Sequence, residues 1–374
     1  MKHIAVNTRL LLSERLEGIS RFGWEVLQRM VERNPEIQFS FLFDRQYDPR
    51  FVQADNVKGY VIPPQARHPL LWFAWFHYQI PRKLDQLGAD LLFSPEFYLS
   101  THPTIPQIPV FHDLAYEHYP QDLKPFASWY CRRYSPRFAE RAAHILTVSS
   151  FSKADLVERY QIPDGKISVV YNGASSQFQP LSETQKAAVR AKYTGGTPYF
   201  HFVGTLNPRK NIENLLRAFD QFKEESDHPH QLLIVGRKGW KYQAALDAYE
   251  SMQHKDAVHF TGFVEDEELP AIYAASEALC YTPYLEGFGI PLLEAMQSET
   301  AIITSDRTSM PEVAGDAALL VDPFSVEAIC VAMRRIVEEP ALRNDLIQKG
   351  RQQRQRFSWD QTYDRVWQVV QGYL

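Results

Sequence analysis

The feature that most constrains the fold is a rhythm of hydrophobicity that runs along the whole chain. Short apolar runs of about four or five residues alternate with longer amphipathic stretches. Short apolar runs bounded by turn residues are typical of strands buried on both faces, and amphipathic stretches are typical of the helices that cover them. The sequence therefore predicts an α/β protein with parallel sheets.

The rhythm occurs twice, so the predicted strands fall into two groups. The first group is 4–7, 39–43, 90–94, 108–111, 145–149 and 167–170, and the second is 199–203, 232–235, 258–260, 278–281 and 301–304. A chain of 374 residues exceeds what one core usually organises. We therefore predict a Rossmann-like domain over 1–180, a linker region over 181–197 with a short polar helix at 183–193, and a second Rossmann-like domain over 198–356.

Composition excludes several classes of protein. The net charge of -5 argues against a protein that coats nucleic acid. The three cysteines are far apart, without the spacing of a disulfide framework or a zinc site, which favours a cytoplasmic location. The first residues enter a predicted strand at once, leaving no room for a signal peptide, and the most apolar stretch, 70–80, is too short to span a membrane.

Three loops that follow strands of the second group carry candidate ligand contacts, because ligands of wound sheets bind at the carboxyl ends of the strands. In the first loop, Gly204 begins a turn that presents Arg209 and Lys210 just before a helix, with Asn211 as its predicted N-cap. Two cations beside a helix N-terminus form an arrangement that a diphosphate requires. The alternative is that both are solvated surface charges.

The second loop leads into a predicted helix with Pro291 as its first residue. The backbone N–H groups of Gly287, Phe288, Gly289 and Ile290 are expected to face an anion or sugar hydroxyls. Two acidic residues bracket this stretch: Glu294 is suited to a ribose diol and Glu286 to hydroxyls of a transferred sugar. A dipole-stabilising glutamate and a solvent-facing glutamate are the alternatives.

Weaker signals lie in the third of these loops and in two further places. Gly236 begins a turn after 232–235, and Val264 follows 258–260, where it could present an apolar slot to a base. In the first group of strands, His112 follows 108–111 at the expected carboxyl end. We assign His112 a role near a transferred sugar, where it would donate or position a hydrogen bond; a structural histidine is the alternative.

These residues resemble the donor site of family-4 glycosyltransferases with the GT-B fold. The resemblance rests on VGTLNPRKNIENLL and EGFGIPLLE, with supporting matches in HDL at His112, TVSSFSKADL, VVYNG, GFVEDEELPAIYAAS and FSWDQT. Gly18 resembles the family's glycine loop, although Ile19 stands where many members carry a second glycine. The resemblance implies two Rossmann-like domains facing a cleft, with a C-terminal helix over 357–374 that crosses back to the first domain.

The resemblance also implies roles for the site residues. Arg209 and Lys210 would hold the diphosphate, Glu294 the ribose and Glu286 the donor sugar, while Gly18, Gly204, Gly236 and Val264 would line the donor. It implies a retaining transferase that needs no metal or cofactor beyond the nucleotide-diphosphate sugar, with an acceptor that is a glycan or lipid-linked saccharide. GDP-mannose is the first expectation for the donor, and a UDP- or ADP-sugar remains open.

Two alternatives and one further hypothesis remain open from the sequence. The alternatives are a nucleotide-sugar epimerase or hydrolase of the same fold and a non-catalytic nucleotide-sugar-binding partner; the absence of a G-x-G-x-x-G stretch argues against a nicotinamide enzyme. The hypothesis concerns 124–137, which mixes arginines with aromatic residues and could lie on the inner face of an anionic membrane. An amphipathic helix packed on the sheet fits the same pattern.

Overall fold

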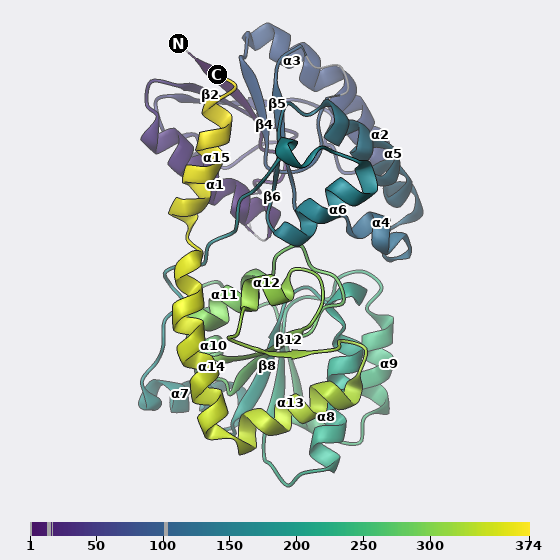
Figure 1. Cartoon of the computed structure of the whole chain (residues 1–374), viewed down its shortest axis with the longest axis vertical. Helices are drawn as coiled ribbons and strands as arrows, with labels where there is room; N and C mark the ends of the chain where they lie inside the picture. Colours follow the sequence, from purple (N-terminus) through teal and green to yellow (C-terminus); the bar gives the residue numbers. More distant parts are fainter. Residues whose placement is uncertain (1, 13–15, 17, 101–103) are drawn as a thin grey trace. The chain divides into compact units, whose positions relative to one another are not determined.

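The computed structural model describes residues 2–12, 16, 18–100 and 104–374. The chain divides into two compact units, and each contains its own sheet (Figure 1). The first unit comprises Met1–Asn172 together with Ser358–Leu374, and the second comprises Gly173–Phe357. The predicted α/β class is confirmed, because neighbouring strands in both sheets pair in parallel.

The first sheet has the strand order β3-β2-β1-β4-β5-β6-β7. Its strands are β1 (His3–Asn7), β2 (Gln38–Phe43), β3 (Val57–Val61), β4 (Leu91–Ser94), β5 (Gln107–Phe111), β6 (Ile145–Thr147) and β7 (Ile167–Val169). The central strands β1, β4 and β5 are buried at every position. This explains why they read as continuous apolar runs in the sequence.

Helices cover both sides of the first sheet. They are α1 (Ile19–Arg33), α2 (Pro69–Ala74), a π-helical segment (Trp75–Gln79), α3 (Ile80–Leu87), α4 (Ala115–His118), α5 (Pro125–Arg141), α6 (Ser150–Tyr160) and α15 (Trp359–Gln371). Figure 1 shows α1 and α15 on one side of this sheet and α2 and α5 on the other. The core on the second side is built on large side chains of these helices, including Trp75, Phe76, Tyr130 and Phe138.

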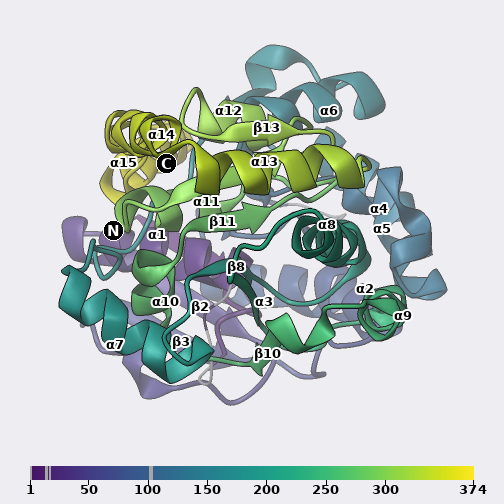
Figure 2. The ribbon, with the colours of Figure 1, turned by 90° about the horizontal axis from the view of Figure 1, so that it is seen from below.

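The second sheet has the strand order β10-β9-β8-β11-β12-β13. Its strands are β8 (Tyr199–Val203), β9 (Gln231–Val235), β10 (Val258–Gly262), β11 (Ala278–Tyr281), β12 (Ala301–Ser305) and β13 (Leu319–Val321). Its helices are α7 (Glu183–Thr194), α8 (Ile212–Glu224), α9 (Gln243–Ser251), α10 (Leu269–Ala275), α11 (Ile290–Gln297), α12 (Met310–Ala314), α13 (Val326–Glu338) and α14 (Pro340–Gln353). Figure 2 shows α8, α9 and α13 on the side of the strands opposite to α7, α10 and α11.

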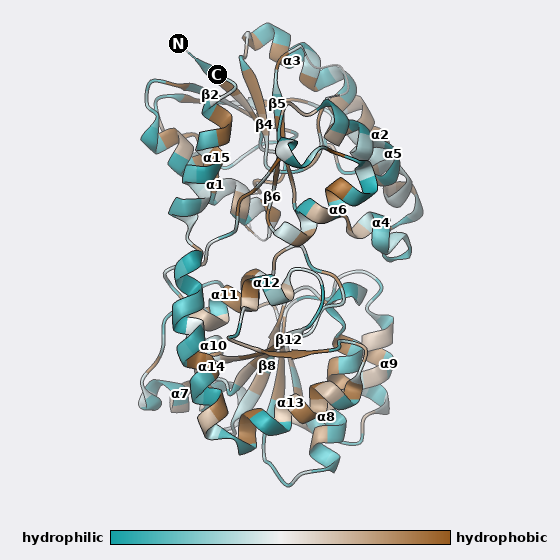
Figure 3. Ribbon diagram, viewed as in Figure 1, coloured by the Kyte–Doolittle hydropathy of each residue, from teal (hydrophilic) through white to brown (hydrophobic). Residues whose placement is uncertain are grey.

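Hydrophobicity follows this layering. Figure 3 shows the most hydrophobic residues on the strands of both sheets, whereas the helices turn polar residues outward. The three cysteines are free, buried thiols. Across the described ranges, no helix of the protein has the length and hydrophobicity needed to cross a bilayer.

The structure departs from the sequence-based expectation at the predicted linker and at two strands. The stretch 181–197 is not an open linker, because α7 packs against α10 within the second unit. The edge strands β3 and β13 were not predicted. Strand β3 is partly exposed and is interrupted by Lys58 and Gly59, and β13 is a partly exposed strand of only three residues. The chain leaves the first unit after Asn172, earlier than the predicted boundary at residue 180.

Local capping differs from expectation at two helices, α8 and α11. Helix α6 is capped by Ser149, whose side chain accepts a hydrogen bond from the Ser152 amide at 3.1 Å. Asn211 occupies the N-cap position of α8 in the left-handed conformation, but its side chain makes no capping bond. Helix α11 begins at Ile290, so Pro291 is its second residue.

The strand order creates a switch point in each unit. In the first sheet the chain runs outward from β1 in one direction through β2 and then returns to pair β4 on the other side of β1. In the second sheet β8 has the same position between β9 and β11. Loops diverge at such points, which leaves space for a ligand at the carboxyl ends of the strands.

Gly236 is required by a close approach of two backbones. After β8 and β9 the two chains continue side by side: the Leu206 amide donates to the Arg237 carbonyl at 3.0 Å and the Gly204 amide to the Val235 carbonyl at 2.9 Å. A Cβ on Gly236 would lie 2.0 Å from the Gly204 carbonyl oxygen, and Gly236 has a φ of 143°. This geometry gives Gly236 a structural reason to be glycine.

We predict that Gly236→Ala lowers the free energy of unfolding of the second unit by about 3 kcal/mol or more, because the methyl group meets a backbone that cannot move without breaking the paired loops. Gly195→Ala is the matched control. Gly195 also has a positive φ, 60°, but an added Cβ there meets nothing within 4 Å, so only about 1 kcal/mol of conformational cost is expected. Urea unfolding followed by circular dichroism measures both values, and equal losses would contradict the proposed backbone overlap.

Candidate functional site

The first candidate site lies at the switch point of the second unit. Strand β8 ends at Val203 and leads through Gly204 into a 3₁₀ turn, Pro208–Lys210, that carries Arg209 and Lys210. Strand β11 ends at Tyr281 and leads into the loop that carries Glu286. The Tyr284 amide donates to the Arg209 carbonyl at 3.1 Å, which ties the two loops together.

Lys210 is the centre of this arrangement. Its Nζ donates to Glu286 Oε2 at 2.6 Å and also to the Tyr281 hydroxyl. The ammonium group lies 4.8 Å from the centroid of the Tyr281 ring. The side chains of Lys210 and Glu286 are only 11% and 15% exposed, so the pair is shielded from most of the solvent. Lys210 and Glu286, predicted separately from the sequence, are therefore brought into direct contact.

The charges in this site shift the pKa of Glu286. Burial alone would raise the pKa of this carboxyl, but the positive charges of Lys210 and Arg209 outweigh burial, and the pKa is lowered. Glu286 is thus ionised at neutral pH and held by a cation. Because the influence of Arg209 reaches Glu286, the two predicted cations and this carboxylate form one electrostatic unit.

Tyr281 is a site residue that the sequence reasoning missed. Its side chain is buried, and burial followed by the charge of Glu286 raises its pKa well above the ordinary value. The charges of Arg209 and Glu294 also act on it. Lys210 thus donates to this hydroxyl, and the charges of the other three candidates, Arg209, Glu286 and Glu294, act on it. Its position as the last residue of a predicted strand was the available signal, since that is where wound sheets present ligand contacts.

The start of α11 supplies the predicted glycine-lined backbone. Gly289 is the N-cap residue, with a φ of 93°. An added Cβ at Gly289 would lie 2.5 Å from Met310 Cε. Phe288 is buried, and its ring packs edge-on against Phe357. Gly287 and Ile290 flank these residues at the helix start, where backbone N–H groups favour an anion.

Glu294 lies on α11, one turn into the helix, and is buried. The Tyr273 hydroxyl, from α10, donates to Glu294 Oε2 at 2.7 Å and so fixes the orientation of the carboxylate. A buried carboxylate held in one rotamer is suited to accept hydrogen bonds from a diol.

The loop that carries Glu286 is anchored on both sides. The Ser309 hydroxyl donates to the Glu286 carbonyl at 2.8 Å, and the Glu286 amide donates to Thr308 Oγ1 at 3.4 Å. Asn211 Nδ2 donates to the carbonyls of Thr282, at 3.0 Å, and Pro323. Asn211 therefore holds the loops after β8 and β11 instead of capping α8.

The remaining predicted donor residues of the second unit lie along the same edge of the sheet. Gly204 follows β8, Gly236 follows β9 and Val264 follows β10. Val264 packs at the border of a small core with Val235 and Leu269. It contributes an apolar surface near the strand ends.

His112 and Gly18 lie in the first unit. His112 Nε2 lies 2.8 Å from the Pro95 carbonyl, which can only accept, so this nitrogen carries the proton. Burial lowers the pKa of His112, which keeps the ring neutral and leaves Nδ1 as an acceptor. The donating role expected of this ring is therefore already used within the protein at Nε2. Gly18 is the N-cap residue of α1, with a φ of 49° that favours glycine.

We predict that Lys210→Met lowers the free energy of unfolding at pH 7 by about 2–3 kcal/mol, because it leaves the Glu286 carboxylate buried without its nearest cation. Adding Glu286→Gln should restore part of this loss. In the unsubstituted protein, folding lowers the Glu286 pKa, so the pair stabilises the fold above the unfolded value of about 4.3 and this contribution is lost as the pH falls through the lower folded value.

Urea unfolding between pH 3 and 8 measures these effects. The matched control is Lys186→Met, which removes a lysine that is paired at 2.9 Å with the exposed Glu183 on α7 and should leave stability unchanged within error. Equal losses for the two lysine variants would contradict the buried-pair interpretation.

Comparison with protein families identifies both units. The model described as Glycosyltransferase Family 4 matches residues 16–178, and the model described as Glycosyl transferases group 1 matches residues 185–353. Among characterised relatives, the chain is 28% identical over 361 residues to O-antigen chain mannosyltransferase B of Escherichia coli, covering 92% of this chain and 93% of that protein. It is 29% identical over 294 residues to O-antigen chain mannosyltransferase RfbU of Salmonella typhimurium, covering 77% of each.

Solved structures share the fold at low sequence identity. A sucrose-phosphate synthase from Thermosynechococcus elongatus superposes with a TM-score of 0.78 at 18% identity, covering 100% of this chain and 99% of that chain. WaaG, a glycosyltransferase involved in lipopolysaccharide biosynthesis, superposes with a TM-score of 0.75 at 17% identity, covering 99% of this chain and 100% of that chain. With two matched family models and this fold, the chain belongs to the family-4 glycosyltransferases of GT-B fold.

Proposed function

We propose that this glycosyltransferase is a retaining, metal-independent mannosyltransferase that uses GDP-mannose and extends a glycan or lipid-linked saccharide. The carrying observation is that Lys210 contacts both Glu286 and the Tyr281 hydroxyl at one switch point, where the charge of Arg209 also acts on both groups. The choice of mannose is supported by similarity to two O-antigen mannosyltransferases.

The chemistry follows from where charge develops. As the bond between the sugar and the diphosphate breaks, its electron pair moves to the phosphate oxygen while positive charge grows on the sugar ring. Arg209, Lys210 and the N–H groups at the start of α11 would stabilise the departing diphosphate, since preorganised donors at such positions contribute about 3–4 kcal/mol each. Because Lys210 already points at Glu286, it is in place before the donor binds.

The two glutamates would divide the remaining contacts. Glu294, oriented by Tyr273, would accept hydrogen bonds from the ribose hydroxyls. Glu286, ionised and beside Lys210, would accept hydrogen bonds from hydroxyls of the transferred sugar and place its ring over the diphosphate. Gly204, Gly236 and Val264 would border the nucleotide.

We propose that the configuration of the anomeric carbon is retained because the acceptor attacks from the same face from which the diphosphate leaves. The acceptor oxygen forms its bond to the anomeric carbon as the old bond breaks, and the proton of the acceptor hydroxyl passes to the departing phosphate oxygen. A double displacement would need a free carboxylate nucleophile on the opposite face. Glu286 is poorly suited to that task because its charge is engaged by Lys210.

We predict that Lys210→Ala lowers turnover about a hundredfold or more, because the developing diphosphate charge loses its nearest ammonium group. Steady-state transfer is measured at a temperature where circular dichroism shows the variant to be folded. Lys186→Ala serves as the control. Lys186 pairs with Glu183 on α7, outside the candidate site, so this variant should retain full activity. A loss below about threefold for Lys210→Ala would reject this assignment.

The donor and the stereochemistry are tested on the unsubstituted enzyme. GDP should raise the melting temperature more than UDP or ADP, NMR of the product should show an α-linked mannose, and EDTA should leave the rate unchanged. A rival enzyme, a nucleotide-sugar epimerase or hydrolase, would consume the donor equally fast without an acceptor. A non-catalytic binding partner would bind GDP but produce no transfer with any acceptor.

We also propose that the first unit touches an anionic membrane surface. Helix α5 buries Tyr130 and Phe138 but leaves Phe126 and Trp129 42% and 52% exposed, with their rings stacked at 5.4 Å. His68 stacks on Phe126, so α2 and its exposed Leu70 continue this surface. Both readings of 124–137 therefore have support: the helix packs on the sheet and presents aromatic side chains outward.

Basic residues on and beside α5 are the reason why we propose an anionic lipid. Lys124, Arg132 and Arg133 are exposed on the same segment as the aromatic pair. Aromatic side chains beside cations favour the headgroup region of an anionic bilayer. Glu117 pairs with Arg132 at 3.2 Å, which offsets part of this charge.

We predict that the protein sediments with vesicles containing about one-third phosphatidylglycerol at low salt and that replacing Phe126 and Trp129 by serine reduces the bound fraction at least fivefold, because the apolar contact is lost. Leu320→Ser, at an exposed position on β13, is the control. No sedimentation of the unsubstituted protein would reject the membrane proposal.

A further inference from the structure

The motif FSWDQT, residues 357–362, lies where the chain returns from the second unit to the first. Phe357 is the last residue of the second unit. Ser358 caps α15 in the first unit, because its side chain accepts a hydrogen bond from the Gln361 amide at 3.2 Å. The two aromatic residues of the motif, Phe357 and Trp359, are buried and lie one on each side of this boundary along the chain. Their contacts show what the motif holds in each unit.

The residues that precede Phe357 hold the C-terminal end of α11. Arg354 Nη1 donates to the carbonyls of Met296, at 3.1 Å, and Gln297, at 3.2 Å. Both carbonyls belong to the last turn of α11, where a cation also complements the helix dipole. Helix α14, which leads into Arg354, packs against α11 as well. One end of α11 is therefore fixed by the segment that leads into the motif.

Phe357 contacts the opposite end of α11 through Phe288. The two rings meet edge-on, with centroids 5.7 Å apart and an interplanar angle of 79°, a geometry that aromatic pairs favour. Both side chains are buried, with exposed fractions of 3% for Phe288 and 4% for Phe357. Phe288 directly precedes Gly289, the N-cap residue of α11. Residues 354–357 therefore hold α11 at both of its ends.

The position of α11 decides the geometry of the proposed donor site. Its first turn carries the backbone N–H groups proposed to bind the diphosphate, and Glu294 lies one turn further on. Such N–H groups contribute most when they are aligned before the ligand binds. Gly287 and Gly289 flank Phe288 and have no side chains. Of these three residues, only Phe288 can therefore anchor the turn to the core.

Trp359 belongs to the first unit and has different neighbours. Its ring lies 6.4 Å from the ring of Phe22 on α1. The Phe22 ring in turn meets the His112 ring edge-on, with centroids 5.1 Å apart. Trp359 therefore packs in the core of the first unit, which makes it an internal comparison for Phe357.

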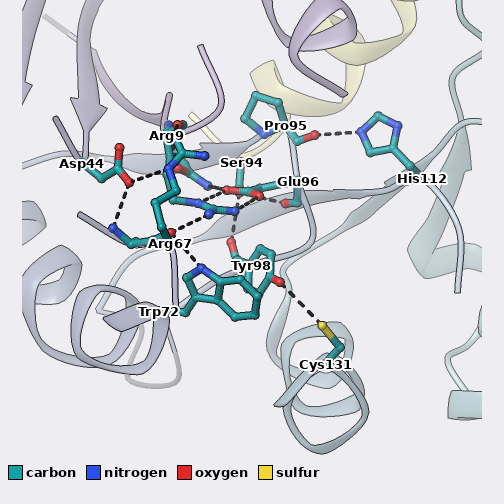
Figure 4. A network of polar contacts seen from close by, with 12 residues as sticks. Arg9, Asp44, Arg67, Trp72, Ser94, Pro95, Glu96, Tyr98, His112 and Cys131 are labelled. Carbon is teal, nitrogen blue, oxygen red and sulfur yellow. Dashed lines mark hydrogen bonds and ion pairs between the residues drawn. The ribbon is translucent and has the colours of Figure 1, made fainter. Parts of the chain in front are cut away.

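His112 leads from this core to a buried ion pair. Its Nε2 donates to the Pro95 carbonyl at 2.8 Å, and Figure 4 shows Pro95 next to Glu96. Arg9 donates through Nε to Glu96 Oε1 at 2.9 Å and through Nη2 to Glu96 Oε2 at 2.5 Å, and Asn7 Nδ2 also donates to Oε1, at 2.8 Å. All these residues lie in the first unit. A change at Trp359 is thus expected to act there and not on α11.

We propose that Phe357 is a positioning residue for donor binding, an inference that rests on the proposed nucleotide-sugar site. Through Phe288, its ring holds the N–H groups at the start of α11 in the direction of the diphosphate, while Arg354 keeps the helix from shifting along its axis. Phe357 acts only through Phe288. The motif therefore has two roles: Phe357 serves the donor site, and the residues from Ser358 onward fasten α15 to the first unit.

Phe357→Leu tests this contact. Leucine keeps the position apolar but offers no ring to Phe288. We predict that the dissociation constant of a nucleoside diphosphate rises five- to tenfold, which corresponds to about 1.0–1.4 kcal/mol. Isothermal titration calorimetry with GDP and with UDP measures it, so the result does not depend on one base. Phe357→Met should stay within twofold of the unsubstituted protein, because its thioether makes a favourable contact with an aromatic ring.

Phe222→Leu is the matched control for a general loss of core stability. Phe222, on α8, is buried and meets Phe200 edge-on at 5.6 Å and 87°, so leucine there removes a ring contact of the same geometry. It should lower the melting temperature about as much as Phe357→Leu does but leave both nucleotide dissociation constants unchanged. Trp359→Phe should also leave them unchanged. Unchanged nucleotide affinity in Phe357→Leu, or an equal loss in either control, overturns the inference.

Hydrogen exchange without nucleotide provides a second, independent measurement. The amides of residues 287–290 should exchange at least tenfold faster in Phe357→Leu, and at the unsubstituted rate in Phe222→Leu and Trp359→Phe. Binding of UDP but not GDP would reject the proposed GDP-mannose donor, and UDP alone then tests the inference. If neither nucleotide binds the unsubstituted protein, the proposed function fails and the exchange rates decide: faster exchange confined to Phe357→Leu supports the positioning of α11, and equal rates overturn it.

Discussion

The reversal of strand order at β1 and at β8 is the constraint that positions the Arg9–Glu96 pair and the candidate site. Each of these strands pairs with one neighbour on either side. The connections that follow the adjacent strands β1 and β4, or β8 and β11, run in opposite directions. The loops at the carboxyl ends of these strands therefore separate, which leaves room between them for polar side chains and a ligand. The candidate site needs no additional element to create its space.

Both units place a buried ion pair at this position. Arg9 pairs with Glu96 beside β1, and Lys210 pairs with Glu286 beside β8. Such pairs bring little net stability because removing two charges from water is costly. They do fix the direction of a carboxylate, and in the second unit the pair also holds the Lys210 ammonium group in one place. Preorganisation of this kind is what a transferase requires, since donors that are already aligned need no rearrangement as charge develops.

Individual residues show where sequence reasoning succeeded and where it stopped. The loop positions of Lys210 and Glu286 followed from strand periodicity, but the contacts of Lys210 with Glu286 and Tyr281 did not, because nothing in the sequence states which loops become neighbours. Asparagine is a common helix-capping residue, yet the Asn211 side chain does not cap α8 because it donates hydrogen bonds to the carbonyls of Thr282 and Pro323. The Arg9–Glu96 pair was missed altogether, since its members are separated by 87 residues and nothing in the sequence states that the loops after the first and third predicted strands become neighbours.

The sequence by itself determined the α/β class, most of the strands and the family, because a strand buried on both faces must be apolar and a phosphate-binding loop must carry its cations and glycines locally. Only the tertiary structure decided the strand order, the packing of α7 into the second unit, the need for glycine at 236 and the contact between Arg9 and Glu96. These features arise from contacts between distant segments, and such contacts depend on how the sheets assemble rather than on any local pattern of residues.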